Sequence, residues 1–437
     1  MSIKLHRRIL GVVVATAVLA FSLQYESQSV IALMPDEVIN WNVVAISVGS
    51  TDGKSGTQQS RIYAMVQIAV HDALNAIEHR YTSYAYSQQE DPTASAPAAI
   101  STAARDVLVD QLSSQAAVII DAAWNTSLGL IVPGSAKDSG IAIGHASAAA
   151  ILALRRDDGS AIVTPYTPGA EPGQWRPTPN PIPPNPAPAA DLLPAAFPGW
   201  GNVLPFALRN GAQFSPDGPP ALTSDQYTQD FDEVKAIGDQ FSTLRTAEQS
   251  TIAQFWYELS PIGWNRIARN VAAASSLDSW EHARLLALLN IAEADAAIAI
   301  FHAKYLYNFW RPVTAIREAD TDGNDNTVSE ADWNTYLNTP NHPDYLSGHS
   351  TFGGAAAEVL ARFFGTDDIA FTTTSGAPFA GITRSFTSLS QAAQENVDAR
   401  IYAGIHFRTA CQDGLQVGQK IGRFIFKHYL QPAHSHG

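Results

Sequence analysis

Apolar side chains recur at helical spacing along most of this 437-residue chain. The clearest amphipathic stretch covers residues 60–78, because positions three and four apart on a helix share one face. His71 and Asp72 lie beside this apolar stripe, and we interpret them as a hydrogen-bonded pair at the edge of the core rather than as a functional pair. The apolar face itself consists of Ile62, Met65, Val66, Ala69, Val70, Ala73, Leu74 and Ile77.

The same periodicity predicts helices in most of the remaining chain. Thr246 and Gln249 have the spacing of a capping box, and Asp278 or Ser279 begins a long helix that Pro312 ends or kinks. No alternating pattern longer than a few residues indicates a strand. The predicted fold class is therefore all-α, a large helical bundle. Its expected helices cover residues 60–78, 97–124, 135–155, 246–259, 279–305, 349–364, 388–403 and 414–429.

A Pro-rich stretch at residues 164–205 interrupts the helical pattern. Its proline density excludes both a helix and a central strand. Its aromatic residues favour an ordered loop that wraps over a helical core, and a domain linker is the alternative. We therefore expect an N-terminal helical part at 33–240, which contains this loop, and a C-terminal helical part at 241–437.

The N-terminus has the pattern of a secretory signal peptide at residues 1–32. Lys4, Arg7 and Arg8 precede the apolar run Ile9–Leu23, and small residues follow. Cleavage is expected between Ala20 and Ala32. An uncleaved membrane anchor is the less favoured alternative, because the run is short for a membrane span. No later segment has the length of a membrane helix. We expect an exported protein, periplasmic or extracellular, without a span in the mature chain.

The net charge argues against a nucleic-acid-binding protein, and the cysteine content excludes an internal disulfide. The formal net charge is −14, which argues against a nucleic-acid-binding surface. Any anion site must therefore be a local cluster of positive charge in a negative protein. The single cysteine, Cys411, excludes an internal disulfide.

A first group of candidate site residues is Lys304 and Arg311. On one helix, their seven-residue spacing would place them on one face, roughly 10 Å apart. Such a pair usually marks a solvated face, but aromatic residues flank these two positions. A buried cation requires an anion, and the planar guanidinium group can bind two oxygens of an oxyanion.

Two further blocks carry donors and imidazoles. Ser347, Gly348 and His349 precede an apolar helix, where a hydroxyl and a backbone N–H can donate to an oxyanion. Arg400 and His406 flank the end of another helix, which Gly404 is expected to interrupt. Singly, these residues indicate a helix cap and a core histidine. Together with the first block, they predict a site for a tetrahedral oxyanion such as phosphate or vanadate.

The three blocks form the signature Lys-x6-Arg-Pro, Ser-Gly-His and Arg-x5-His, between Lys304 and His406. This signature resembles that of the vanadium-dependent haloperoxidases and the type 2 phosphatidic acid phosphatases, which include soluble bacterial acid phosphatases. The longer context Tyr345–Gly354 is similar to the haloperoxidase branch. The large helical exported chain with its Pro-rich middle resembles that branch as well.

The resemblance implies a role for each residue. His406 would be the metal ligand to vanadate, or would form a phosphohistidine in a phosphatase, which needs no vanadate. His349 would be the acid–base residue, and Lys304 and His342 complete the candidate catalytic set. A His at the position of His342 resembles the bromide-oxidising members. The oxyanion would be held by Lys304, Arg311, Ser347, Gly348 and Arg400.

The chain departs from the family pattern at three positions. Leu346 stands where the family has Pro before Ser-Gly-His, and Ala399 where it has Ser before Arg. Many members carry Asp four residues after the last His, where this chain has Ala410. We therefore expect either Asp413 or a backbone carbonyl to orient His406.

Three functions remain open. The favoured one is an exported vanadium-dependent haloperoxidase that oxidises halide, with bromide or iodide favoured, using hydrogen peroxide to halogenate a small organic acceptor. An acid phosphatase of the same superfamily is the alternative. A non-catalytic oxyanion-binding protein would explain the cations but not the pair of histidines. The resemblance also suggests that Glu258 braces Arg400.

Overall fold

The structure is a computed structural model that describes residues 36–178 and 194–433. Within these ranges the chain is mainly helical, and its only strands are the short antiparallel pair β1 (Phe371–Thr374) and β2 (Thr383–Phe386), which pairs Phe371 with Phe386. The predicted all-α fold class is confirmed. The predicted signal peptide lies outside the described residues, and the division into parts at 240/241 stays a prediction.

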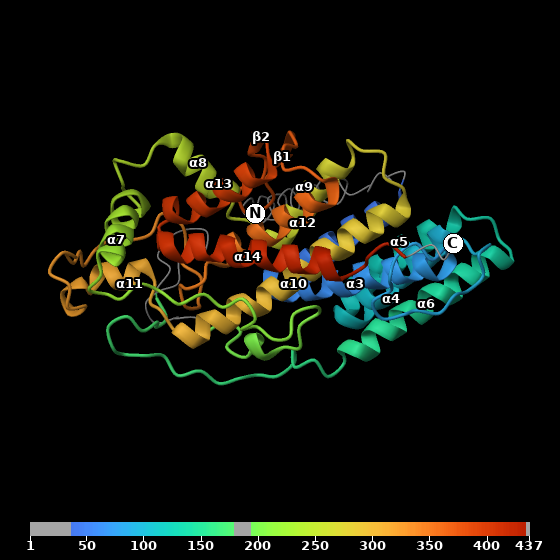
Figure 1. Cartoon of the computed structure of the whole chain (residues 1–437), viewed down its shortest axis with the longest axis horizontal. Coiled ribbons are helices and arrows are strands. Elements are labelled where there is room, and N and C mark those ends of the chain that lie inside the picture. The colour runs from blue at the N-terminus through green and yellow to red at the C-terminus, as the bar shows by residue number, and fades with distance from the viewer. Residues whose placement is uncertain (1–35, 179–193, 434–437) are drawn as a thin grey trace, which may run out of the picture.

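Figure 1 shows an elongated molecule, with α3–α6 gathered towards one end and α7, α8 and α11 towards the other. The helices of the N-terminal half are α2 (Glu37–Thr51), α3 (Gly56–Ile77), α4 (Ala96–Gln111), α5 (Ser114–Gly129), α6 (Ser135–Arg155) and α7 (Asp225–Gly238), with the 3₁₀ turn η2 (Trp200–Asn202). The later helices are α8 (Ala247–Phe255), α9 (Ser260–Ala272), α10 (Ser279–Tyr307), α11 (Pro312–Arg317), α12 (Gly348–Phe364), α13 (Leu389–Tyr402) and α14 (Arg408–His428), with the 3₁₀ turn η3 (Ala319–Thr321).

The central element is α10, which packs against α3, α12 and α14. Asp278 caps it, within the predicted start at Asp278 or Ser279, through a capping box that was not predicted, in which its carboxylate accepts the Glu281 N–H and Glu281 accepts the Asp278 N–H. In the described part of the chain, α10 is the one helix long and apolar enough to span a membrane, so the prediction that no segment after the N-terminal run has that length is wrong. It is almost wholly enclosed by the other helices, as expected of a core helix.

Glycines bring α12 and α14 unusually close together. A Cβ atom at Gly418 would lie 2.1 Å from the Thr351 carbonyl oxygen, and one at Gly354 would lie 2.3 Å from the Leu415 carbonyl oxygen. Side chains at these positions would push the helices apart. This packing fixes the start of α12, and with it the Ser-Gly-His block, against the start of α14.

Several predicted helix boundaries are wrong. The helix expected at 97–124 is two helices, because Leu112 is extended and Ser113 caps α5 by accepting the Ala116 N–H. The capping box at Thr246 is present, but α8 ends at Phe255 rather than 259. The last helix, α14, begins at Arg408, six residues before the predicted start.

The described parts of the Pro-rich stretch lie against the helical core. Trp175 is fully buried, and its backbone N–H donates to the Asn308 carbonyl at the end of α10 over 2.8 Å. Beyond the gap at 179–193, the Ala196 N–H donates to the Asn341 carbonyl over 2.8 Å. Both sides of the stretch therefore reach the C-terminal half of the chain.

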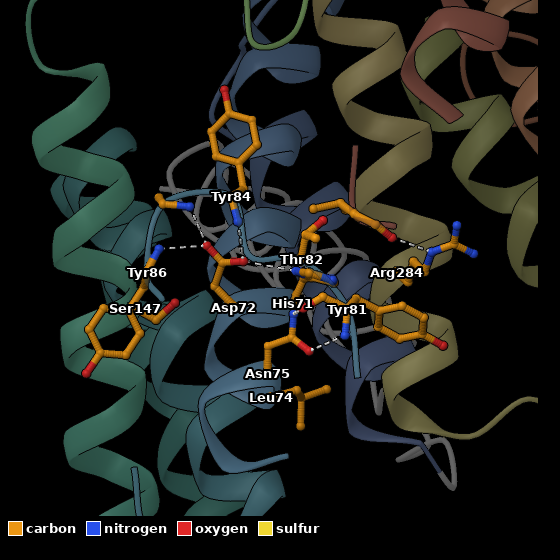
Figure 2. Close-up of polar contacts among 12 residues, drawn as sticks. His71, Asp72, Leu74, Asn75, Tyr81, Thr82, Tyr84, Tyr86, Ser147 and Arg284 are labelled. Atoms are coloured by element: carbon orange, nitrogen blue, oxygen red, sulfur yellow. Dashed lines mark hydrogen bonds and ion pairs between the residues drawn. The ribbon is translucent and has the colours of Figure 1, made fainter. Parts of the chain in front are cut away.

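His71 and Asp72 belong to the core, as predicted, and both are buried on α3. Figure 2 shows the Asp72 carboxylate facing the segment after α3, where it accepts backbone N–H groups of Tyr84, Ala85 and Tyr86 at 2.6–2.9 Å. His71 Nδ1 lies 3.0 Å from the same carboxylate. This pair anchors a loop, which is a structural role.

Candidate active site

The C-terminal end of α10 delivers the first cation. Lys304 lies in the last turn, is fully buried, and donates from Nζ to the carbonyls of Pro343 and Asp344 at 2.6 and 2.9 Å. The helix ends at Tyr307, because Asn308 adopts the left-handed conformation with φ 48°. The prediction that Lys304 and Arg311 share one helical face is therefore wrong.

Arg311 reaches the site from the start of α11, where it is the residue before the first turn. Pro312 disfavours a helical conformation at Arg311, which is extended. Its guanidinium group donates to the carbonyls of His342 and Ile405 at 2.8 and 2.7 Å. The same group lies 3.0 Å from His406 Nε2 and 2.9 Å from His342 Nδ1, so it joins the three predicted blocks.

Arg400 lies in the last turn of α13, and His406 lies in the turn between α13 and α14. Gly404 has φ 78° and lies so close to Gly238 that a Cβ atom would be 2.2 Å from the Gly238 carbonyl oxygen, so the turn requires glycine. The turn brings the buried His406 back towards Arg400. Arg400 donates to the Trp256 carbonyl over 2.8 Å, whereas its buried Nε has no hydrogen-bond partner among the described residues.

The carboxylate beside His406 is Asp344, which the sequence reasoning missed. Asp344 Oδ1 lies 2.7 Å from His406 Nδ1 and 3.8 Å from an Arg311 nitrogen, and all three side chains are buried. The opposite ring nitrogen, Nε2, faces the Arg311 guanidinium group at 3.0 Å, so a ligand on Nε2 would replace that contact. The signal was present in the sequence, since Asp344 stands inside the His342–His349 block, but its partner cannot be deduced from spacing.

Two predicted carboxylate roles are wrong. Asp413 does not orient His406, because its Oδ2 accepts the Tyr345 hydroxyl over 2.7 Å. Glu258 does not brace Arg400. Its carboxylate forms an ion pair with Arg266 and accepts the Gly376 N–H over 3.0 Å.

His349 contacts the backbone of Glu258. Its Nε2 lies 2.9 Å from the Glu258 carbonyl oxygen. A carbonyl can only accept, so Nε2 carries the proton of the neutral ring and Nδ1 is the free acceptor. Burial, together with the nearby Arg400 charge, lowers the pKa of His349 well below 6.5. A neutral imidazole with a free acceptor nitrogen can take a proton from a substrate.

A cavity of about 270 Å³ unites most of the predicted residues. Its polar floor contains Lys304, His342, Gly348, His349, Arg400 and His406. Arg311 is fully buried and contacts His406 Nε2. Ser347 is fully buried as well, and its hydroxyl accepts from Ser350 over 2.9 Å. The geometry thus brings the three cations and three histidines together, and donation from the Ser347 hydroxyl to an oxyanion stays a prediction.

The site is electrostatically suited to an anion. Burial lowers the pKa of Lys304 well below its ordinary value, and lowers the pKa of both Arg311 and Arg400 to about 10. Burial raises the pKa of Asp344 to about 7, against the opposing effect of Arg311 and Lys304. Three buried cations thus face, among the described residues, a single partly neutralised carboxylate. A bound oxyanion would relieve that imbalance.

These residues fit vanadate. In the described part of the chain, no three His, Cys, Asp or Glu side chains gather as ligands for a metal cation. An anionic metal oxide needs cationic donors and one nitrogen ligand instead, and the cavity offers both. His406 Nε2 would be the ligand, and Lys304, Arg311, Arg400 and the Gly348 N–H would hold the oxygens.

Comparison with known proteins agrees with this chemistry. The family model described as the VCPO second helical-bundle domain matches residues 284–435, the part that carries all three blocks. The vanadium chloroperoxidase of Curvularia inaequalis is 28% identical over 200 residues, which is 38% of this chain. That match spans about a third, 32%, of the curated relative.

Solved structures extend the similarity to nearly the whole chain. A bacterial vanadium-dependent iodoperoxidase covers 91% of this chain and 97% of its own, with 25% identity and a TM-score of 0.77. A bacterial vanadium-dependent chloroperoxidase covers 86% of this chain and 92% of its own, with 18% identity and a TM-score of 0.70. The fold is the helical-bundle fold of these vanadium-dependent haloperoxidases. The family model and these relatives support the haloperoxidase branch of the superfamily for this chain.

Proposed function

We propose that this protein is a vanadium-dependent haloperoxidase that oxidises halide with hydrogen peroxide at a vanadate bound to His406. The observation that carries the proposal is the closeness of Asp344 Oδ1 to His406 Nδ1, because the opposite nitrogen, Nε2, then faces a buried cation, Arg311, that an oxyanion ligand would also contact. The named relatives are an iodoperoxidase and chloroperoxidases, which supports the same reaction class.

Bound vanadate would supply Lewis-acid activation of the peroxide O–O bond. Lys304, Arg311 and Arg400 would balance the negative charge of the anion and orient its oxygens. His349 would accept a proton from the incoming peroxide at Nδ1, since Nε2 is held by the Glu258 carbonyl. The products of halide oxidation are hypohalous acid and water, and the halogen then passes to an organic acceptor.

Acid phosphatase activity is the competing function, because His406 could equally attack a phosphate ester. One assay separates the two. Purified protein, with and without added vanadate, is tested for peroxide-dependent halide oxidation and for hydrolysis of a phosphate ester. A haloperoxidase oxidises halide only with vanadate. Ester hydrolysis that vanadate inhibits, without halide oxidation at any vanadate concentration, would replace this proposal with the phosphatase.

Bromide and iodide are the proposed halides. His342 lines the cavity, its Nδ1 lies 2.9 Å from Arg311, and its ring meets that of Phe301 edge-on at 5.5 Å. An imidazole at this place can influence both the halide and the pH profile. In His342→Phe, halide preference or pH optimum should therefore shift. If both remain unchanged, the preference for bromide or iodide over chloride loses its basis in this residue.

We also propose that the enzyme is exported, on the basis of the basic and apolar N-terminal segment at residues 1–32. Expression of the full chain, followed by N-terminal sequencing of the protein outside the cytoplasm, tests this. A new N-terminus between residues 20 and 33 is expected. Intact chain retained inside the cell would contradict export.

A further inference from the structure

The short segment between α8 and α9 contacts two of the predicted site residues through its backbone. The Glu258 carbonyl oxygen lies 2.9 Å from His349 Nε2. Two residues earlier, the Trp256 carbonyl accepts from Arg400 over 2.8 Å. The backbone of His349 is held separately, because its carbonyl accepts from the Asn396 side chain over 3.0 Å. The direction of the His349 ring therefore depends on where the Glu258 carbonyl lies.

The side chain of Glu258 is anchored by residues outside the oxyanion site. Its carboxylate is 5% exposed, forms a two-oxygen ion pair with Arg266 of α9, and accepts the Gly376 N–H over 3.0 Å. Arg266 in turn donates from Nε to the Thr373 hydroxyl of β1 over 3.2 Å. A buried carboxylate requires such partners, and the fork of an arginine fixes both of its oxygens. This anchor therefore fixes the residue whose carbonyl faces His349.

Two glycines leave the space that this carboxylate occupies. A Cβ atom at Gly376 would lie 2.7 Å from Glu258 Oε2, and one at Gly263 would lie 3.0 Å from Glu258 Oε1. Gly376 belongs to the turn of the β1–β2 hairpin, which packs on α9 and α13 (Figure 1). A continuous set of contacts thus joins the hairpin to the site, from Gly376 through Glu258 to His349.

We propose that Glu258 is a positioning residue: anchored by Arg266 and the Gly376 N–H, it holds the proton of the neutral His349 ring on Nε2 and so keeps Nδ1 free to accept a proton. The inference rests on the proposed haloperoxidase function, in which His349 accepts a proton from peroxide. The Glu258 carboxylate itself reaches no reactant. It acts through its own carbonyl, which can accept a hydrogen bond but cannot donate one.

The first measurement follows the His349 ring in the vanadate-free protein. Nitrogen NMR of isotope-labelled histidine distinguishes an N–H from a bare ring nitrogen, and the His349→Gln variant identifies the signals of this residue. The unsubstituted protein should carry the proton on Nε2. Glu258→Gln should show both tautomers, because the new amide N–H group would face the Arg266 or Gly376 donors. A proton on Nδ1 in the unsubstituted protein, or identical signals in the two proteins, would overturn the inference.

The second measurement separates positioning from a general loss of stability. In the vanadate-loaded enzyme, Glu258→Gln should lower kcat/KM for peroxide several-fold, which is less than the about 10²–10⁴-fold expected when His349 itself is removed. In a His349→Ala background, the same substitution should cause no further loss, because both residues act through one group. An equal loss in the two backgrounds, or no loss in either, would contradict the positioning role.

The vanadate dissociation constant should stay unchanged in Glu258→Gln. Trp256, which contacts Arg400, has an anchor of its own, since its indole N–H donates to Glu395 over 3.0 Å. Peroxide turnover and vanadate affinity therefore separate if Glu258 positions His349. A loss of vanadate affinity as large as the loss in kcat/KM would show that Glu258 supports the whole site instead.

Arg266 provides a series in which Glu258 itself is retained, in case Glu258→Gln does not fold. Arg266→Met removes the charge that holds the carboxylate, so it should reproduce the loss in kcat/KM. Arg266→Lys keeps the charge but not the fork, so its loss should be smaller. Unfolding midpoints are measured in parallel. Unaltered kcat/KM and an unaltered His349 tautomer in a folded Arg266→Met protein would contradict the anchor.

Glu358→Gln is the matched control. Glu358 lies on α12, the helix that carries His349, and it too pairs with arginines, Arg362 and Arg423. Its removal should leave kcat/KM for peroxide unchanged, and a loss equal to that of Glu258→Gln would show that the effect is not specific. Absence of halide oxidation at every vanadate concentration would defeat the proposed function instead. The tautomer measurement needs neither vanadate nor turnover, so it tests the role of Glu258 in that case as well.

Discussion

At the scale of single residues, the site depends on which nitrogen of each histidine is free. The sequence identifies His406 and His349, because three short blocks carry chemistry that is specific only in combination. It cannot identify Asp344 as the partner of His406, because that contact joins two blocks 62 positions apart in the chain (406 minus 344). It offers Asp413 or a backbone carbonyl instead, and Asp413 accepts the Tyr345 hydroxyl.

Asp344→Asn should weaken vanadate binding about 10–100-fold, the usual loss when a partner of a metal-bound histidine is removed. An amide is uncharged, so the attraction between the Asp344 carboxylate and the His406 ring, whose Nδ1 lies 2.7 Å from it, would be lost. The measurement is the vanadate dissociation constant by equilibrium dialysis, together with the unfolding midpoint. Asp413→Asn is the control, and its dissociation constant should be unchanged.

Ala410 offers a rescue of an Asp344 variant. Ala410 and Asp344 line the same narrow gap beside Phe407, so a carboxylate at 410 can approach the position that is emptied in Asp344→Ala. Ala410→Asp combined with Asp344→Ala should therefore bind vanadate more tightly than Asp344→Ala alone. Equal affinities for Asp344→Asn and the unsubstituted protein would show that Asp344 does not position His406.

The pKa of His349 sets the expected pH dependence. Burial and the Arg400 charge lower it well below 6.5, so the ring is neutral at neutral pH and can accept a proton. Activity is retained above that pKa and lost as the pH falls through it. The acid limb of kcat/KM for peroxide should therefore lie below pH 6.5. The variant His349→Ala should still bind vanadate, but its turnover should fall about 10²–10⁴-fold, the usual loss when a general acid–base group is removed. An acid limb above pH 6.5 would show that another group is the base.

At the scale of secondary-structure elements, helix starts are easier to predict than helix ends. Side chains near in sequence make the caps, so Thr246 and Asp278 can be identified directly. The end of α10 depends instead on Asn308, whose carbonyl accepts from Trp175 of the Pro-rich stretch. Such a contact has no local signal. The sequence therefore predicts a helix that continues to Pro312, and wrongly places Lys304 and Arg311 on one face.

The close contact between α12 and α14 gives a test at this scale. Gly418→Ala should destabilise the protein by roughly 1–3 kcal/mol, because the added Cβ would lie 2.1 Å from the Thr351 carbonyl oxygen. Gly129, at the end of α5, has open space around it, since a Cβ atom there would meet nothing within 4 Å, and Gly129→Ala is the control. The free energy of unfolding in urea measures both. Equal stabilities would contradict the packing described for this helix pair.

At the scale of the whole molecule, the fold class follows from periodicity, whereas the cavity does not. Helical spacing is a local property, and it predicts an all-α bundle correctly. The cavity combines Ser55–Thr57, Ala196–Phe197 and Leu259–Pro261 with the three blocks, and only the packing of α3, α9 and α10 brings these segments together. Nothing in the sequence of those segments indicates that they lie at one site.

The central claim is that vanadate on His406 makes this protein a haloperoxidase. The most direct test titrates vanadate into the metal-free protein and follows peroxide-dependent bromide or iodide oxidation, in parallel with His406→Ala. The account predicts activity that rises to a plateau at equimolar vanadate, and no vanadate-dependent activity in His406→Ala, because its protein–metal bond is lost. Equal vanadate-dependent activity in both proteins, or none in the unsubstituted protein at any vanadate concentration, would contradict it.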